Sequence, residues 1–333
     1  MLRMGVIGFG YWGPNVVRNF GSAEGVRVVS ISDQNPEALK RAGKAYSGLE
    51  LTSDYREIVR STGIDAVAIV TPVSEHFHLA KEALQNGKHV FVEKPFTSTS
   101  AQAEELTELA DKKKLTIMVD HTFLFTGAVR KMKDLIEGDE LGDLCYYDSM
   151  RVNLGLFQHD SNVIWDLAPH DLSIMDHLIE GRPEAISAAG ANHLTKHEYV
   201  AYITIYYAGG VIGHLNVNWM SPVKVRTTLV GGEKKMLVWN DLDPDVKIKV
   251  YDKGVEIRNR EGVYDLLVSY RSGDMWAPKL DQTEALKLEA QYFVDCVTND
   301  KTPFNDGRAG LRIVKMLESA DKSLKKRGEL VYL

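Results

Sequence analysis

Cysteines and long apolar runs are scarce in this chain, and each scarcity excludes a class of protein. Among 333 residues only Cys145 and Cys296 are cysteines, too few and too far apart for a disulfide framework or a metal-binding cysteine set. No stretch approaches the roughly 20 apolar residues that a membrane-spanning helix needs. Met1 leads straight into an apolar segment without the features of a secretory signal. We expect a cytoplasmic protein with no membrane partner.

An excess of positive charge is also lacking. The formal net charge is -6, so nothing draws the chain as a whole toward nucleic acid, and we expect no nucleic-acid partner. The composition, 44% hydrophobic and 26% charged residues, is that of an ordinary globular protein. Because domains typically hold about 100 to 200 residues, this length favours two of them.

The first third of the chain alternates short apolar runs with helical patterns. Apolar segments at 3–10, 26–33, 65–72, 88–95 and 115–123 are separated by patterns typical of helices, the last of them at 100–114. Strands that alternate with helices predict βαβ units and a parallel sheet buried on both faces. The sequence therefore predicts an α/β dinucleotide-binding (Rossmann) domain over residues 1–120.

The rhythm changes over residues 121–333. Two helical stretches, 127–137 and 169–180, precede strand patterns that follow one another at 184–193, 198–207, 210–220, 225–232, 234–241 and 246–252. Two more helices, 285–297 and 307–326, close the chain. Consecutive strands without intervening helices predict an open antiparallel or mixed sheet, which gives a second α/β domain for substrate binding and oligomerisation.

A glycine motif lies at the end of the first predicted strand. Gly8, Gly10 and Gly13 have the G-x-G-x-x-G spacing, and the next predicted strand ends at Asp33, about 20 residues further on. This context predicts a site for a dinucleotide, with the ribose hydroxyls on Asp33. No Arg or Lys directly follows Asp33 to meet a 2'-phosphate, so NAD is favoured over NADP. The alternative is that Asp33 only caps the helix near Pro36.

The variable positions of this motif hold Phe9, Tyr11 and Trp12, and Pro14 follows. Pro14 fits the first turn of a helix, where its missing N–H breaks no bond. Tyr11 and Trp12 face the diphosphate and the cleft beyond it. They either shield the cofactor by burial or form part of a substrate wall.

Two further motifs carry reactive side chains. Glu93, Lys94 and Pro95 follow a predicted parallel strand, at the sheet edge where such folds bind ligands. Asp166 and His170 are four residues apart, so on a helix they share one face. The alternative for His170 is a structural role beside a capping Asp166.

Taken together, these motifs resemble the Gfo/Idh/MocA family, named for glucose-fructose oxidoreductase, inositol dehydrogenase and a rhizopine-catabolism protein. The resemblance covers nearly the whole chain. It implies a Rossmann domain, an α/β domain whose open sheet serves oligomer contacts, and oxidation of a pyranose or cyclitol, or reduction of a ketone, with a nicotinamide cofactor. The stretches around Tyr11, Gln158 and Lys224 are most similar to a branch that acts at C3 of nucleotide-linked sugars such as UDP-N-acetylglucosamine-derived uronates.

Elementary chemistry agrees with that reaction. Oxidising a secondary alcohol needs a base for the hydroxyl proton, a hydride acceptor and charge that stabilises a developing alkoxide. His170, NAD and Lys94 can supply these three, although the sequence leaves open which of Lys94 and His170 moves the proton. A helix N-terminus at His170 lowers its pKa while Asp166 raises it, so we expect the two effects to balance near neutrality.

Other polar and aromatic residues complete the candidate site. For the cofactor we expect contacts from the glycine motif with Phe9, Tyr11 and Trp12, and from Asp33, Thr71, Pro72, His76, Glu93, Lys94, His121 and Trp165. For the substrate we expect contacts from Lys94, Arg151, Asn153, Gln158, Asn162, Asp166, His170, Lys224 and Arg226. The alternatives are ordinary roles, because polar loop positions are mostly solvated. His76 and His78 lack a third ligand at useful spacing, so no metal is expected.

The sequence as a whole predicts an NAD-dependent dehydrogenase of a nucleotide-linked sugar, working as a homo-oligomer, dimer or tetramer. Two enzymatic alternatives are a free cyclitol or monosaccharide dehydrogenase and a 3-ketosugar reductase. A regulator that binds NAD without turnover is the alternative of another class, and Lys94, Asp166 and His170 argue against it.

Overall fold

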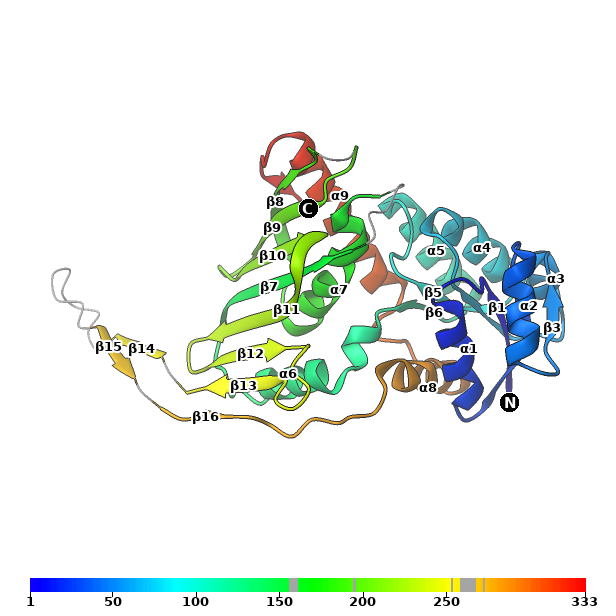
Figure 1. Cartoon of the computed structure of the whole chain (residues 1–333), viewed down its shortest axis with the longest axis horizontal. Coiled ribbons are helices and arrows are strands. Elements are labelled where there is room, and N and C mark those ends of the chain that lie inside the picture. Colours follow the sequence, from blue (N-terminus) through cyan, green and yellow to red (C-terminus); the bar gives the residue numbers. More distant parts are fainter. Residues whose placement is uncertain (156–160, 194–195, 253, 258–267, 272) are drawn as a thin grey trace. The chain divides into compact units, whose positions relative to one another are not determined.

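The computed structural model describes residues 1–155, 161–193, 196–252, 254–257, 268–271 and 273–333 (Figure 1). The chain forms two compact units. The first unit holds Met1–Phe125 and Thr283–Glu318, and the second holds Thr126–Gln282 and Ser319–Leu333. The boundary expected at residue 120 lies near the first passage between them, and the chain later returns to the first unit.

The first unit contains a parallel sheet in the strand order β3-β2-β1-β4-β5-β6. The order reverses between β1 and β4, and ligands of open α/β sheets bind at such a point, beside the carboxyl ends of the strands. The strands are β1 (Leu2–Ile7), β2 (Val26–Ser32), β3 (Glu50–Thr52), β4 (Ala66–Ile69), β5 (His89–Glu93) and β6 (Ile117–Asp120). The predicted Rossmann architecture is confirmed, and β3 was not predicted from the sequence.

Helices connect these strands: α1 (Gly13–Ser22), α2 (Pro36–Ala45), α3 (Tyr55–Val59), α4 (Val73–Gln85) and α5 (Ser100–Lys113). All four residues of β4 are buried, as expected for a strand that is covered on both faces. Side-chain caps begin α2, α3 and α5. The turn η1 (Thr122–Phe125) follows β6.

Two late helices, α8 (Ala285–Thr298) and α9 (Gly307–Lys325), follow the second unit in the sequence. Phe293 of α8 packs edge-to-face on Phe20 and Phe91, with 5.8 Å between ring centroids in both pairs. Phe293 is fully buried. Residues from the last sixth of the chain therefore complete the core that the first hundred residues begin.

The described part of the second unit contains a nine-stranded sheet in the order β16-β13-β12-β11-β7-β10-β9-β8-β17. Only β10 and β7 pair in parallel among the described strands of this sheet, so it is mixed, as predicted. The strands are β7 (Leu144–Leu154), β8 (Pro183–Ala191), β9 (Val200–Tyr207), β10 (Ile212–Asn218), β11 (Met220–Gly232), β12 (Met236–Asn240), β13 (Ile248–Tyr251), β16 (Met275–Trp276) and β17 (Val331–Tyr332). Strands β14 (Gly254–Ile257) and β15 (Val268–Arg271) pair in a separate two-stranded antiparallel sheet.

Two helices of the second unit, α6 (Gly127–Glu137) and α7 (Val163–Leu178), lie beside this sheet (Figure 1). Helix α7 contacts β7, β9 and β10. On β7, Tyr147, Ser149 and Arg151 are buried while Asp148 and Met150 between them are exposed, so successive side chains face opposite sides. Among the described helices, none combines the length and apolarity that crossing a membrane requires.

Candidate active site

The glycine loop after β1 has the geometry that a dinucleotide needs. Gly8 has φ +99°, and a Cβ there would lie 2.5 Å from the Val70 carbonyl oxygen. A Cβ on Gly13 would lie 2.6 Å from the Gly8 carbonyl oxygen, whereas a Cβ on Gly10 would meet nothing within 4 Å. The first and third glycines thus serve packing, and the second leaves an open face where a pyrophosphate can approach the main chain. Together with the start of α1, the loop fits NAD.

Asp33 lies directly after β2 and braces this loop. Its Oδ2 accepts a hydrogen bond from the Phe9 N–H at 2.6 Å, and its Oδ1 accepts one from Asn35 N–H at 2.8 Å. Asn35 is the residue that caps α2, through its bond from Glu37 N–H at 3.0 Å. The alternative in which Asp33 merely caps that helix is therefore wrong, and its carboxylate lies beside the loop, where the adenosine ribose binds in this fold.

The two aromatic residues of the loop differ sharply. Tyr11 is 94% exposed. Trp12 is half-buried, and its indole N–H donates to Oδ2 of Asp120, at the end of β6, at 3.1 Å. Trp12 is thus tied to the sheet edge, while Tyr11 is exposed, and a cofactor shield and a substrate wall both stay predictions.

His76, expected to contact the cofactor, instead holds two loops together. His76 is fully buried, and its Nε2 and Nδ1 lie 2.8 Å and 2.9 Å from the carbonyl oxygens of Thr71 and Pro95. Burial lowers the pKa of His76. The ring joins the loop after β4, where Pro72 precedes α4, to the loop after β5, and His78 is exposed on α4.

Glu93 ends β5 and Lys94 follows it, at the same sheet edge as the glycine loop because the strands are parallel. Glu93 lies opposite Asp120 in the register of β5 and β6. Burial, and then the carboxylate of Asp120, raise the pKa of Glu93 well above its ordinary value. Lys94 is half-buried and can present its ammonium group at this edge.

Behind Lys94, three carboxyl groups lie close together: Glu93, Asp120 and Glu289. Glu289 of α8 is fully buried, and its Oε1 accepts hydrogen bonds from His121 N–H at 3.1 Å and from Asn305 Nδ2 at 3.2 Å. Burial and then Asp120 raise its pKa well above the ordinary range. The Thr122 hydroxyl donates to Asp120. Asp120 is thus the acceptor for both Trp12 and Thr122, beside two glutamic acids whose pKa values are raised.

Sequence reasoning missed Asp120 and Glu289, and a signal for Glu289 was present. On α8, Leu286, Glu289, Ala290 and Phe293 recur at helical spacing and all are buried, so an acid on that apolar stripe indicates a buried role. His121, an expected cofactor contact, is 3% exposed. Burial lowers its pKa to about 4, so it is neutral near pH 7.

In the second unit, Asp166 and His170 lie one turn apart on α7. Asp166 Oδ2 accepts a hydrogen bond from the indole N–H of the buried Trp219 at 2.8 Å. Asn162 caps the helix, accepting from the N–H groups of Ile164 and Trp165, so the alternative of a capping Asp166 is wrong. The expected helix N-terminus at His170 is also wrong, because the dipole effect is confined to the first turn and α7 begins at Val163.

Three residues expected to contact ligands have partners inside the second unit. Arg151 is 4% exposed, and its Nε donates to Asp171 Oδ2 at 2.6 Å. Asn162 Nδ2 and the Trp165 indole N–H each donate to Asp321, both at 2.8 Å. These contacts give the three residues structural roles inside the second unit.

The remaining expected substrate residues belong to strands or lie outside the described residues. Asn153 is half-buried on β7, and Lys224 is exposed on β11 within a register shift between Met220 and Val225. Arg226 on β11 lies 3.3 Å from Asp241, measured between Nη1 and Oδ2. Gln158 lies outside the described residues.

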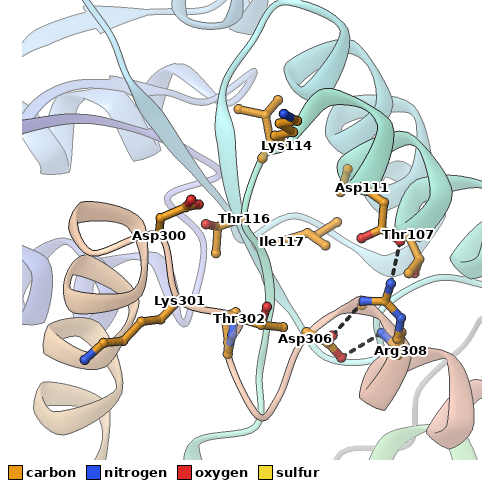
Figure 2. Close-up of a pocket in the computed structure, with 14 residues that line it drawn as sticks. Thr107, Asp111, Lys114, Thr116, Ile117, Asp300, Lys301, Thr302, Asp306 and Arg308 are labelled. Carbon is orange, nitrogen blue, oxygen red and sulfur yellow. Dashed lines mark hydrogen bonds and ion pairs between the residues drawn. The ribbon is translucent and has the colours of Figure 1, made fainter.

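A polar pocket of about 200 Å³ in the first unit lies at the other edge of the sheet (Figure 2). It is lined by the end of α5, the start of β6 and the segment before α9. Arg308 forms ion pairs there with Asp111 at 2.6 Å and with Asp306 at 3.3 Å. Asp306 also accepts hydrogen bonds from the N–H groups of Arg308 and Ala309, near the start of α9. Because the glycine loop and Lys94 lie at the carboxyl ends of the strands, this pocket is not part of the candidate site.

Comparisons with known proteins agree with the fold and the glycine loop. Residues 2–121 match the oxidoreductase family with an NAD-binding Rossmann fold, and residues 129–238 match the Gfo/Idh/MocA C-terminal domain. Together these two models cover more than half of the chain.

The similarity to individual relatives is low in identity but covers nearly the whole chain. The chain is 25% identical to scyllo-inositol 2-dehydrogenase (NAD(+)) of Bacillus subtilis, over 91% of this chain and 88% of the relative. It is also 25% identical to UDP-N-acetylglucosamine 3-dehydrogenase of Acidithiobacillus ferrooxidans, over 94% of each. The solved structure of the latter superposes with a TM-score of 0.83 at 22% identity, covering 98% of both chains. The chain belongs to the Gfo/Idh/MocA family of NAD-binding oxidoreductases and is a dehydrogenase of that family.

Proposed function

We propose that this chain oxidises a secondary hydroxyl, at C3, of a nucleotide-linked sugar such as a UDP-N-acetylglucosamine-derived uronate. The observation that carries the proposal is the reactive set itself: Lys94 directly after β5 and the Asp166–His170 pair on α7. The similarity to UDP-N-acetylglucosamine 3-dehydrogenase, which extends over 94% of both chains, supports the substrate class.

The chemistry divides between the cofactor and the side chains. NAD bound at the glycine loop supplies the acceptor for the hydride that leaves the carbinol carbon. The hydroxyl proton passes to Lys94 or His170, and a ketone is formed. The ammonium form of Lys94 stabilises negative charge on the substrate oxygen. The hydrogen bond from Trp219 fixes the Asp166 carboxylate one turn before His170.

A free cyclitol is the second candidate substrate. The scyllo-inositol dehydrogenase of B. subtilis is as similar to this chain, at 25% identity, as the sugar-nucleotide enzyme is. The two substrates differ in charge, because a nucleotide-linked sugar carries a diphosphate that needs cations. The exposed Lys224, together with Arg226, is suited to that role, and a cyclitol needs neither side chain.

Titration of the NAD-loaded protein with UDP-N-acetylglucosamine, its uronate and myo-inositol tests the substrate class. We expect the sugar nucleotides to bind and to be oxidised, and Lys224→Met to weaken their binding without changing NAD affinity. Saturable binding and oxidation of myo-inositol alone would replace the proposal with the cyclitol dehydrogenase.

Two variants test the catalytic assignment. Lys94→Met and His170→Asn should each lower turnover by about 10²-fold or more, the usual scale for a lost acid–base group, with NAD affinity nearly unchanged. His78→Asn, on the exposed side of α4, is the matched control and should keep wild-type turnover. Wild-type turnover in both Lys94→Met and His170→Asn would refute the assignment. NAD binding without turnover of any substrate would favour the regulator.

We also propose a homo-oligomer and a cytoplasmic location. The face of the second unit's sheet away from α7 exposes Met150, Tyr202, Tyr206 and Ile212, each at least 40% exposed, and Tyr206 pairs with Ile212 in the β9–β10 register. Such a patch is suited to a second copy of the chain. Tyr206→Lys should shift the mass measured by light scattering toward the monomer. Both cysteines are free, which fits a reducing compartment.

A further inference from the structure

The backbone of one residue in the glycine loop, Phe9, lies between two opposite charges. The N–H of Phe9 donates to Asp33 Oδ2 at 2.6 Å, and the carbonyl oxygen of Phe9 accepts a hydrogen bond from Arg41 Nη2 at 3.3 Å. Asp33 follows β2, and Arg41 lies within α2. A carboxylate and a guanidinium thus reach the same residue, between Gly8 and Gly10.

Phe9 lies where the cofactor is expected to bind, so the charges of Asp33 and Arg41 bear on cofactor choice. In this fold the acid after the second strand accepts hydrogen bonds from the adenosine ribose, and a nearby arginine can accommodate a 2'-phosphate. The segment directly after Asp33 contains no such arginine. The fold instead brings Arg41 to this site from the second turn of α2. The residues directly after Asp33 in the sequence do not reveal it.

Arg41 is also available for an anion. It is exposed, and its hydrogen bond to the Phe9 carbonyl is the interaction that the structure gives its guanidinium; among the described residues no carboxylate lies within 4.0 Å of it. Its neighbour Lys40, by contrast, lies 3.8 Å from Glu37. A guanidinium bound to one neutral carbonyl keeps donors for a phosphate, which it binds with a charge-assisted fork.

We propose that Arg41 is a latent ligand for a 2'-phosphate and that Asp33 prevents its use, so the preference for NAD is set by Asp33 acting against Arg41. With Asp33 charged, a 2'-phosphate approaching the ribose site meets a carboxylate at once. Without that charge, Arg41 can leave the Phe9 carbonyl and bind the phosphate. The inference concerns the cofactor alone and holds for whichever sugar is oxidised.

Calorimetric titration with NAD and NADP tests the proposal on four forms of the protein: the wild type, Asp33→Asn, Arg41→Met and the double variant. Asn at position 33 keeps an acceptor for the Phe9 N–H, and Met keeps the apolar stem of the arginine. Asp33→Asn should bind NADP about tenfold or more tightly than the wild type, the scale of one hydrogen bond to a charged group. The double variant should lose that gain. Arg41→Met alone should leave NAD affinity within about threefold, since NAD lacks the phosphate.

Lys40→Met in the Asp33→Asn background is the matched control, one residue away on the same helix, and should keep the gain in NADP affinity. If the Asp33→Asn/Arg41→Met protein binds NADP as tightly as Asp33→Asn, or if Lys40→Met loses the gain equally, Arg41 is not the ligand and the proposal fails. Should Asp33→Asn not fold, Asp33→Ser also removes the charge and takes its place, with 2',5'-ADP and 5'-AMP as the probes. In the Asp33→Ser background, Arg41→Met must weaken the binding of 2',5'-ADP while leaving 5'-AMP binding unchanged, and equal affinities for 2',5'-ADP overturn the proposal.

Discussion

The two units bury charged groups in opposite ways. In the second unit the Arg151 guanidinium donates two hydrogen bonds to Asp171, at 2.6 Å and 3.2 Å, and the Ser149 hydroxyl donates a third at 2.8 Å. Burial opposes the charged form of Arg151, yet Asp171 raises its pKa. Opposite charges satisfy each other there.

The first unit instead brings together three carboxyl groups, of which Asp120 and Glu289 are buried and Glu93 is half-buried. Glu93, Asp120 and Glu289 face one another with His121, whose ring is neutral. Burial and mutual repulsion raise the pKa of both glutamic acids, which favours their protonated forms. The comparison teaches that the carboxyl group cluster of the first unit, the one that binds NAD, should make stability depend on pH.

The largest effect should follow from breaking the ion pair of the second unit. Arg151→Met leaves Asp171 buried without its partner, and loss of one member of a buried pair costs about 3–5 kcal/mol. Denaturant-induced unfolding measures this loss. Arg3→Met, which removes an exposed pair with Asp65, is the control and should cost far less. Equal losses in the two variants would show that burial of the Arg151 pair does not matter.

Acid should weaken the protein through His121. Its pKa falls from 6.5 to about 4 on folding, so between these values the unfolded chain binds a proton that the folded chain does not. Stability from this group is present above pH 6.5 and declines as pH falls through that window, by about 3 kcal/mol in total. His121→Asn should lose the dependence in unfolding curves at pH 4.5 to 7. Parallel curves for the two proteins would contradict the assignment.

Glu289 should act in the opposite direction. Its folded pKa is raised above 4.5, so the folded chain keeps a proton that the unfolded chain has lost, and wild-type stability declines as pH rises above 4.5. Glu289→Gln resembles the protonated acid and should remove this decline, which is up to about 1.4 kcal/mol per pH unit. The same unfolding curves measure it, with Glu108→Gln, exposed on α5, as control. A wild-type slope in the Glu289→Gln variant would rule out a protonated Glu289.

The smallest effect should come from Trp12. Trp12→Phe removes the donor to Asp120 and should cost about 1 kcal/mol, the net worth of one hydrogen bond. Tyr11→Phe, at a position 94% exposed, should change nothing. Thermal unfolding distinguishes the two variants, and identical behaviour would mean that the Trp12–Asp120 bond contributes nothing.

The sequence predicted the first unit well because its information is local. Apolar strands alternate with helices there, and the glycine spacing specifies the turn after β1. Strand β7 was missed, although it lies in the middle of the larger sheet, because it carries Asp148 and Arg151. Arg151 can be buried because it pairs with Asp171, 20 residues away in the sequence. Only the folded structure shows that pairing.

The candidate site shows the same division. Glycines, Asp33, Lys94 and the Asp166–His170 pair stand out in short segments. Contacts such as those of Glu289 with His121, 168 residues earlier, or of Arg41 with Phe9 join segments that no local pattern connects. The roles of Arg151, Asn162 and Trp165 could not be predicted for that reason, since their partners lie on other elements.

The return of α8 to the first unit has a consequence for synthesis on the ribosome. Phe20 and Phe91 are translated early, but Phe293, which packs on both of them, leaves the exit tunnel only after the whole central segment has been made. Domains that are continuous in sequence can fold as they emerge. A nascent chain that stops before residue 283 lacks α8 and displays an aromatic surface instead of a finished core. The growing polypeptide is therefore a natural client for chaperones that bind exposed apolar segments until translation ends.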